Sequence, residues 1–200
     1  TVNDEVLKTI GRKHTAQQFF DAFELARKCG FDNINTDLIA GLPTDTPESF
    51  KNSLDSIVRL NAECITVHTL CMKRASRLTT EGVTLDLQQA RDAREMLAYT
   101  QNILGPNEYI PYYMYRQSRM VGNLENVGWS KKGFESLYNV YVMDETHTIL
   151  ACGSGGVTKL KRNNPDYLER IFNFKYPYEY IDRFDELIQR KSGIMQFYGQ

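Results

Sequence analysis

The sequence predicts an α/β fold in which parallel βα units are followed by an α+β extension. Apolar residues at helical spacing alternate with short β-branched runs over residues 1–106, a pattern typical of parallel sheets with crossover helices. Beyond residue 106 this alternation stops, and tyrosine-rich runs and glycine-rich turns take over. We therefore expect three segments: βα units over residues 1–106, a strand-rich extension over 107–162 and a helical tail over 163–200.

Two helices are predicted before the first strand. Asn3 or Asp4 can cap a short helix that ends at Gly11. Thr15 then caps a longer helix with a phenylalanine-rich apolar face, and Gly30 ends it.

The predicted βα units follow directly. A strand is expected from Ile34 to Ile39, ended by the Gly-Leu-Pro sequence at residues 41–43. The residues Asp-Thr-Pro-Glu at 45–48 are a capping signal with proline in the first turn, so a helix is expected there. A β-branched run at 64–70 predicts a second strand, and Asp86 can start a helix that closes at the Gly-Pro pair of 105–106.

The extension and the tail are less regular. Residues 109–115 and 137–143 are predicted as strands, separated by a glycine- and asparagine-rich loop at 122–129. Residues 157–160 are expected to be extended, after the glycine-rich run at 153–156. From residue 163 the chain is polar with apolar residues at helical spacing, which predicts helices.

The composition limits the classes of function that this chain can have. With 200 residues, 42% of them hydrophobic and 24% charged, the chain can bury one sizeable core. A net charge of -1 gives no bias toward nucleic acid or an acidic membrane surface. The longest apolar runs fall short of the roughly 20 residues of a spanning helix. The polar start carries no secretory signal, and four scattered cysteines suit a reducing compartment, so we expect a cytoplasmic protein.

Asp37 is the strongest candidate for a ligand-binding residue. It lies in a strand predicted to be buried, where an ionised carboxylate is rarely found without a partner. In barrel-like α/β folds the carboxyl ends of strands carry the chemistry, so Asp37 is expected to bind ribose hydroxyls or an ammonium group. The alternative is a structural aspartate that caps a turn or pairs with Arg12.

Arg12 stands at a helix–helix junction, where a guanidinium group can clamp a carboxylate. A solvated surface arginine is the alternative. His14 precedes a helix and is interpreted as a capping or surface residue. His68 lies in a strand of otherwise apolar or small residues and could face a barrel interior, although a core residue with a satisfied hydrogen bond is the favoured interpretation. The glycine-rich run at 153–156 lacks the spacing of a dinucleotide-binding loop and is interpreted as a backbone wall beside a ligand.

Three blocks of sequence resemble a known family. Gly-Arg-x-His at 11–14, Asn-Ile-Asn-x-Asp-Leu-Ile-x-Gly-Leu-Pro at 33–43 and Thr-Pro-Glu-Ser-Phe at 46–50 resemble the oxygen-independent coproporphyrinogen III oxidases of the radical S-adenosylmethionine (radical SAM) class. The blocks at 113–117, 122–128 and 153–160 are similar to the coproporphyrinogen dehydrogenase branch from Gram-positive bacteria. The resemblance covers nearly the whole chain and implies the C-terminal part of a partial (β/α)6 barrel.

The resemblance also implies cofactors and site residues. Arg12 and Asp37 match family positions that contact S-adenosylmethionine, Cys71 matches a small residue lining that site, and Val157 matches an apolar contact to the adenosyl group. The family's chemistry implies a 4Fe-4S cluster, an external electron donor and a porphyrinogen substrate. A radical derived from S-adenosylmethionine begins the oxidation of substrate propionates, which lose carbon dioxide and become vinyl groups.

One departure from the family pattern bears on activity. The Cys-x-x-x-Cys-x-x-Cys motif of the cluster is not in this sequence, and its place in the family precedes Thr1. We therefore expect a C-terminal portion that is inactive alone, with an exposed sheet edge that favours self-association. Two alternatives stay open: a haem-delivery protein, with His14, His68 and His147 as candidate axial ligands, and a non-catalytic scaffold.

Overall fold

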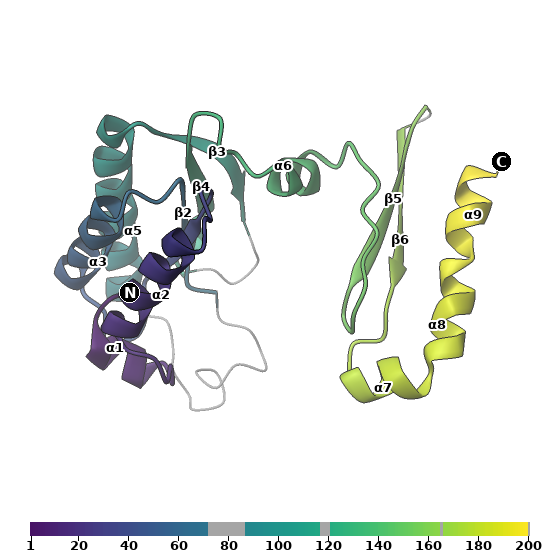
Figure 1. Ribbon diagram of the computed structural model, residues 1–200, viewed down its shortest axis with the longest axis horizontal. Coiled ribbons are helices and arrows are strands. Elements are labelled where there is room, and N and C mark those ends of the chain that lie inside the picture. Colours follow the sequence, from purple (N-terminus) through teal and green to yellow (C-terminus); the bar gives the residue numbers. More distant parts are fainter. Residues whose placement is uncertain (72–86, 117–120, 165, 200) are drawn as a thin grey trace. The chain divides into compact units, whose positions relative to one another are not determined.

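The computed structural model describes residues 1–71, 87–116, 121–164 and 166–199. These residues form two compact units, Thr1–Ser136 and Leu137–Gln200, whose elements are labelled in Figure 1. Each unit is described by itself. The predicted start of a helix at Asp86 lies outside the described residues.

The first unit is built on a four-stranded sheet with the order β1-β2-β4-β3. Strand β1 (Asn35–Ala40) and strand β2 (Cys64–Thr69) are parallel, in register from Asn35 opposite Cys64 to Ala40 opposite Thr69. Strand β4 (Asn126–Lys131) is antiparallel to β2, and β3 (Tyr109–Tyr115) is antiparallel to β4. The predicted parallel βα unit is therefore confirmed, and antiparallel strands extend it.

The helices of this unit begin where their capping signals predict. Asn3 accepts hydrogen bonds from two backbone N–H groups at the start of α1 (Asp4–Thr9), and Thr15 forms a reciprocal capping box with Gln18 on α2 (Ala16–Lys28). Thr46 caps α3 (Pro47–Arg59), which has proline in its first turn. Helix α5 (Leu87–Leu104) is followed by the 3-10 turns η1 (Gly105–Asn107) and, before β4, η2 (Val121–Asn123).

The sheet has one covered face and one polar face. On the covered face, alternate strand residues pack with α3 and α5 in an apolar core whose most buried members are Leu38, Ala40, Phe50, Leu54, Ile57, Ile65, Val67, Met96 and Leu104. On the other face, β1 presents Asn35 and Asp37, which are exposed, and Ile39, which is half-buried. Strand β1 was expected to be buried, and the structure buries it on one face only, because its residues alternate between the core and the polar face.

The second unit is a hairpin with helices. Strands β5 (Val157–Asn163) and β6 (Asp166–Phe172) pair in antiparallel fashion, preceded by α6 (Leu137–Asp144) and followed by α7 (Pro177–Asp182), α8 (Phe184–Lys191) and α9 (Gly193–Tyr198). Its buried apolar side chains include Leu160, Phe174, Leu187 and Phe197.

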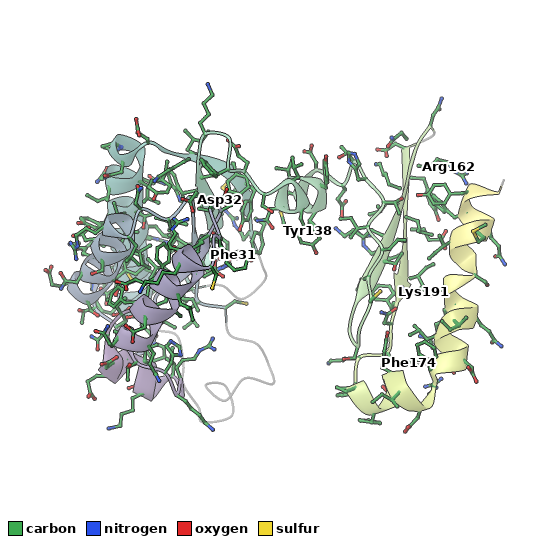
Figure 2. The ribbon with its side chains drawn as sticks, in the orientation of Figure 1. Phe31, Asp32, Tyr138, Arg162, Phe174 and Lys191 are labelled. Atoms are coloured by element: carbon green, nitrogen blue, oxygen red, sulfur yellow. The ribbon has the colours of Figure 1, made fainter. Side chains whose placement is uncertain are left out.

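Cationic side chains join the hairpin of the second unit to its C-terminal helices (Figure 2). Lys191 on α8 donates to the hydroxyl of Thr158 at 2.6 Å, and the guanidinium of Arg162 lies 4.8 Å from the ring centroid of Phe197 on α9. The guanidinium groups of Arg183 and Arg190 each lie 4.1 Å from the ring centroid of Phe174. Because this small unit has few buried apolar residues, cation–π contacts contribute to its packing.

Three local predictions in the C-terminal half are wrong. Residues 137–143, predicted as a strand, lie in helix α6, and residues 126–129, predicted as a loop, lie in strand β4. Residues 166–172, predicted as helical, form β6, because pairing with β5 overrides their helical spacing. The extended conformation at 157–160 is confirmed. The division at residues 106 and 162 stays a prediction.

Among the described residues, no helix is both long enough and apolar enough to cross a lipid bilayer.

Candidate functional site

A cavity of about 460 Å³ lies beside strand β1, between this strand and the N-terminal segment that contains α1 and the start of α2. The polar face of β1 and β2 contributes Asp37, Ile39 and His68 to its wall, and the turn after α1 contributes Arg12 and His14. Helices α1, α2 and α3 and the loops beside them complete the wall with Thr1, Val2, Leu7, Ile10, Phe19, Leu42 and Ile57. An apolar cavity with a few convergent polar groups is typical of a small-molecule site.

Asp37 lies in the middle of β1 rather than at its end. Its side chain is 58% exposed, and its two oxygens have different neighbours. The amide of Asn35 donates to Oδ1 at 2.7 Å, and Nε2 of His68 lies 3.7 Å from Oδ2. The interaction with His68, followed by that with Asn35, lowers the pKa of Asp37, although partial burial opposes this. Asp37 is therefore an ionised acceptor at neutral pH.

Two tyrosines of β3 extend this polar face across the sheet. Tyr113, Gly128 and Thr66 are aligned across β3, β4 and β2, and the tyrosine hydroxyl lies 3.2 Å from Oγ1 of Thr66. A Cβ atom on Gly128 would lie 1.9 Å from the Tyr113 ring, so the ring crosses β4 where only glycine leaves room. The Tyr115 ring stacks beside it, with ring centroids 6.3 Å apart.

Arg12 and His14 reach the cavity from the turn that follows α1. The Arg12 N–H donates to the carbonyl of Leu7 at 2.8 Å, and Gly11 takes the left-handed conformation that ends the helix. The structure thus brings Arg12 and Asp37 to one cavity wall. The structure places Nε2 of His68 3.7 Å from the Asp37 carboxylate, whereas the alternative drawn from the sequence was a pair with Arg12.

The other two predicted residues lie elsewhere. Cys71 is half-buried just after β2, and the cavity lining given by the described residues does not include it. Val157 begins β5 in the second unit, which is described separately from the unit that contains the cavity. The cofactor-binding roles of Arg12, Asp37, Cys71 and Val157 all stay predictions.

Sequence reasoning missed the partners of Asp37. It favoured a core role for His68 over one facing a barrel interior, and it assigned no contact with Asp37 to Asn35 and none with His68 to Tyr115. The available signal was a period of two: Asn35 and Asp37 on β1, and Thr66 and His68 on β2, place polar side chains on one face of two neighbouring strands.

The described residues do not fit a metal cluster. Cys29, Cys64, Cys71 and Cys152 form no disulfide. Burial raises the pKa of the Cys64 thiol, which disfavours the thiolate form that a cluster needs. No group of three His, Cys, Asp or Glu side chains suited to a metal was found within residues 1–71, 87–116, 121–164 and 166–199.

Comparison with protein families and curated proteins gives consistent matches. Residues 1–57 match the model of the radical SAM superfamily. The chain is 37% identical over 193 residues to the oxygen-independent coproporphyrinogen-III oxidase-like protein HemZ of Bacillus subtilis, covering 96% of this chain and 38% of that protein. It is 32% identical to the heme chaperone HemW of Lactococcus lactis, covering 82% of this chain and 41% of the relative. The chain thus spans about two fifths of the length of these relatives.

A solved structure has the same fold. Coproporphyrinogen III oxidase (HemN) from Escherichia coli, a radical SAM enzyme, matches with a TM-score of 0.64 over 92% of this chain and 41% of its own, at 19% identity. The predicted α/β fold of the radical SAM type is therefore confirmed, whereas the number of barrel units stays a prediction.

Proposed function

Since this chain belongs to the radical SAM superfamily, among its oxygen-independent coproporphyrinogen oxidase-like members, we propose that it supplies part of the S-adenosylmethionine site of an oxidoreductase acting on a porphyrinogen. The proposed reaction is the oxidative decarboxylation of coproporphyrinogen III propionates to vinyl groups. The proposed reaction requires an external electron donor and would be a step of haem biosynthesis. The proposed compartment is the cytoplasm.

The observation that carries this proposal is the meeting of Asp37 and Arg12 in one cavity. The lowered pKa of Asp37 keeps its carboxylate ionised, so that it can accept hydrogen bonds from the two ribose hydroxyls. The guanidinium of Arg12 suits the carboxylate of the methionine moiety, because its N–H donors match a carboxylate in a bidentate pair. A volume of about 460 Å³ lies within the usual range of ligand sites.

The 4Fe-4S cluster would supply the electron that cleaves S-adenosylmethionine. Because the cysteines of the described residues are scattered, we propose that its thiolate ligands come from outside these 200 residues. The role proposed for this chain is limited to binding. Asp37 orients the ribose, Arg12 orients the methionine carboxylate, and Ile39 and Phe19 provide apolar walls that exclude water. Self-association through the outer edge of β1 remains part of the proposal.

Isothermal titration calorimetry of the 200-residue chain with S-adenosylmethionine measures the binding affinity and so tests the proposal. We expect Asp37→Ala to weaken binding by at least about tenfold, which corresponds to losing a charge-assisted hydrogen bond of about 1.5–3 kcal/mol. Asp32→Ala is the matched control, because Asp32, labelled in Figure 2, is exposed in the loop before β1 and is not among the residues that line the cavity. Equal affinity of Asp37→Ala and Asp32→Ala would reject the site.

Haem delivery is a second candidate function, favoured by the match to the heme chaperone HemW. His14 and His68 line the same cavity, so that either could serve as an axial ligand, and His147 lies in the second unit. Titration with haem distinguishes the candidates. Delivery predicts a shift of the Soret band that is lost in His14→Ala or His68→Ala. The oxidase proposal predicts no histidine-dependent shift.

A further inference from the structure

His68 connects the Asp37 carboxylate to a tyrosine hydroxyl two strands away. Its Nε2 lies 3.7 Å from Oδ2 of Asp37 on β1, and its Nδ1 lies 3.5 Å from the hydroxyl of Tyr115 on β3. The His68 side chain is 28% exposed and lines the cavity together with Asp37. A Tyr–His–Asp series therefore crosses the polar face of the sheet and ends at the cavity.

The hydrogen-bonding capacity of these groups sets their roles. A neutral imidazole has one N–H donor and one acceptor nitrogen, and the partner of one nitrogen determines the state of the other. If the Tyr115 hydroxyl donates to Nδ1, the proton lies on Nε2, which faces Asp37. Loss of this donor would allow the opposite tautomer, which would place a nitrogen lone pair toward the carboxylate.

The Asp37 carboxylate has a polar neighbour beside each of its oxygens. An ionised carboxylate offers about four lone-pair positions, two on each oxygen. Asn35 occupies a position on Oδ1 and His68 faces Oδ2, so that each oxygen keeps one position for a ligand. Two acceptors on adjacent oxygens match the two donors of a vicinal diol. Without these neighbours, a side chain that is 58% exposed would sample several rotamers.

We propose that His68 is a positioning residue for diol recognition: it orients the Asp37 carboxylate toward the two hydroxyls of a ribose, and Tyr115 maintains the tautomer that this requires. This inference rests on the proposed function, because it assigns the ribose of S-adenosylmethionine to Asp37. The contact of 3.7 Å is longer than a hydrogen bond, and we expect it to shorten when a diol fixes the carboxylate.

The test compares ligands with and without one hydroxyl. S-Adenosylmethionine and its 2′-deoxyribose analogue are titrated into the full chain, and the ratio of the two dissociation constants measures diol recognition. We expect a ratio of about ten or more for the unmodified chain, falling at least threefold in His68→Phe and in Tyr115→Phe. His68→Gln retains the ratio because its amide nitrogen reaches the position of Nε2, whereas the shorter His68→Asn does not.

The outcomes separate this inference from the proposed function. A purely structural role predicts that His68→Phe weakens both ligands equally, and an unchanged ratio would overturn the inference. If Asp37→Asn leaves the ratio unchanged, Asp37 is not the diol acceptor and the proposed site itself fails. If Asp37→Asn lowers the ratio and His68→Phe does not, only the role of His68 is rejected. If His68→Phe does not fold, the ratios of dissociation constants for His68→Gln and His68→Asn are compared instead. Equal ratios for these two variants would overturn the role of His68.

Discussion

The two faces of the four-stranded sheet differ in chemistry, although they alternate residue by residue along the same strands. On the covered face, Leu38, Ile65 and Val67 are at most 1% exposed and pack against α3 and α5. On the polar face, the neighbouring positions hold Asp37 and His68, which contact each other beside a cavity. The difference indicates that stability depends on one face and the proposed binding on the other, so substitutions should separate the two.

The largest loss of stability is expected on the covered face. Leu54 on α3 is fully buried in the core, so Leu54→Ala should lower the free energy of unfolding by about 2–5 kcal/mol. Leu25→Ala is the control, because Leu25 on α2 is 60% exposed. Urea denaturation followed by circular dichroism measures both. A Leu54→Ala variant that unfolds at the same midpoint as Leu25→Ala would contradict the assignment of the core.

A smaller loss is expected from a substitution on the polar face. Gly128→Ala would place a Cβ atom 1.9 Å from the Tyr113 ring, and displacing that ring should cost about 1–3 kcal/mol of unfolding free energy. The same substitution in a Tyr113→Ala background should cost much less, because the obstructing ring is absent. Gly105→Ala is the control, since a Cβ atom there meets nothing within 4 Å. Equal costs in both backgrounds would exclude the clash as the cause.

The elements predicted well are those encoded by local signals. The sequence offered Asn3 or Asp4, Thr15 and the residues 45–48 as caps, and the helices are capped by Asn3, Thr15 and Thr46, because a cap is recognised within one helical turn. Strands β4 and β6 were missed because their conformation depends on pairing with distant partners. Helix α6 was predicted as a strand because its valine and tyrosine residues have high β propensity.

The candidate site also contains residues that the sequence predicted and contacts that it did not. Arg12 and Asp37 were selected from residue type and sequence context, and the structure places both at the cavity. The contact between His68 and Tyr115 was not predictable, because it depends on the register of β3 against β4 and of β4 against β2. A single sequence does not specify the register of strands so far apart.

The smallest effect concerns the pH dependence of stability on the polar face. The interaction with His68 lowers the pKa of Asp37 in the folded state. The carboxylate therefore stabilises the fold above its unfolded pKa of about 3.9, and this contribution is lost as the pH falls through the lower folded pKa. Because the side chain is 58% exposed, the contribution should be below about 1 kcal/mol.

Asp37→Asn isolates this contribution. We expect the stability of the unmodified chain to fall more steeply than that of Asp37→Asn as the pH decreases from about 5 to 2, the range that follows from the lowered pKa. Urea midpoints across this range measure the difference, with Asp32→Asn in the exposed loop before β1 as the control. His68→Phe should reduce the same difference, because it removes the main cause of the lowered pKa. Parallel pH profiles for Asp37→Asn and the unmodified chain would show that the contact does not stabilise the folded state in solution.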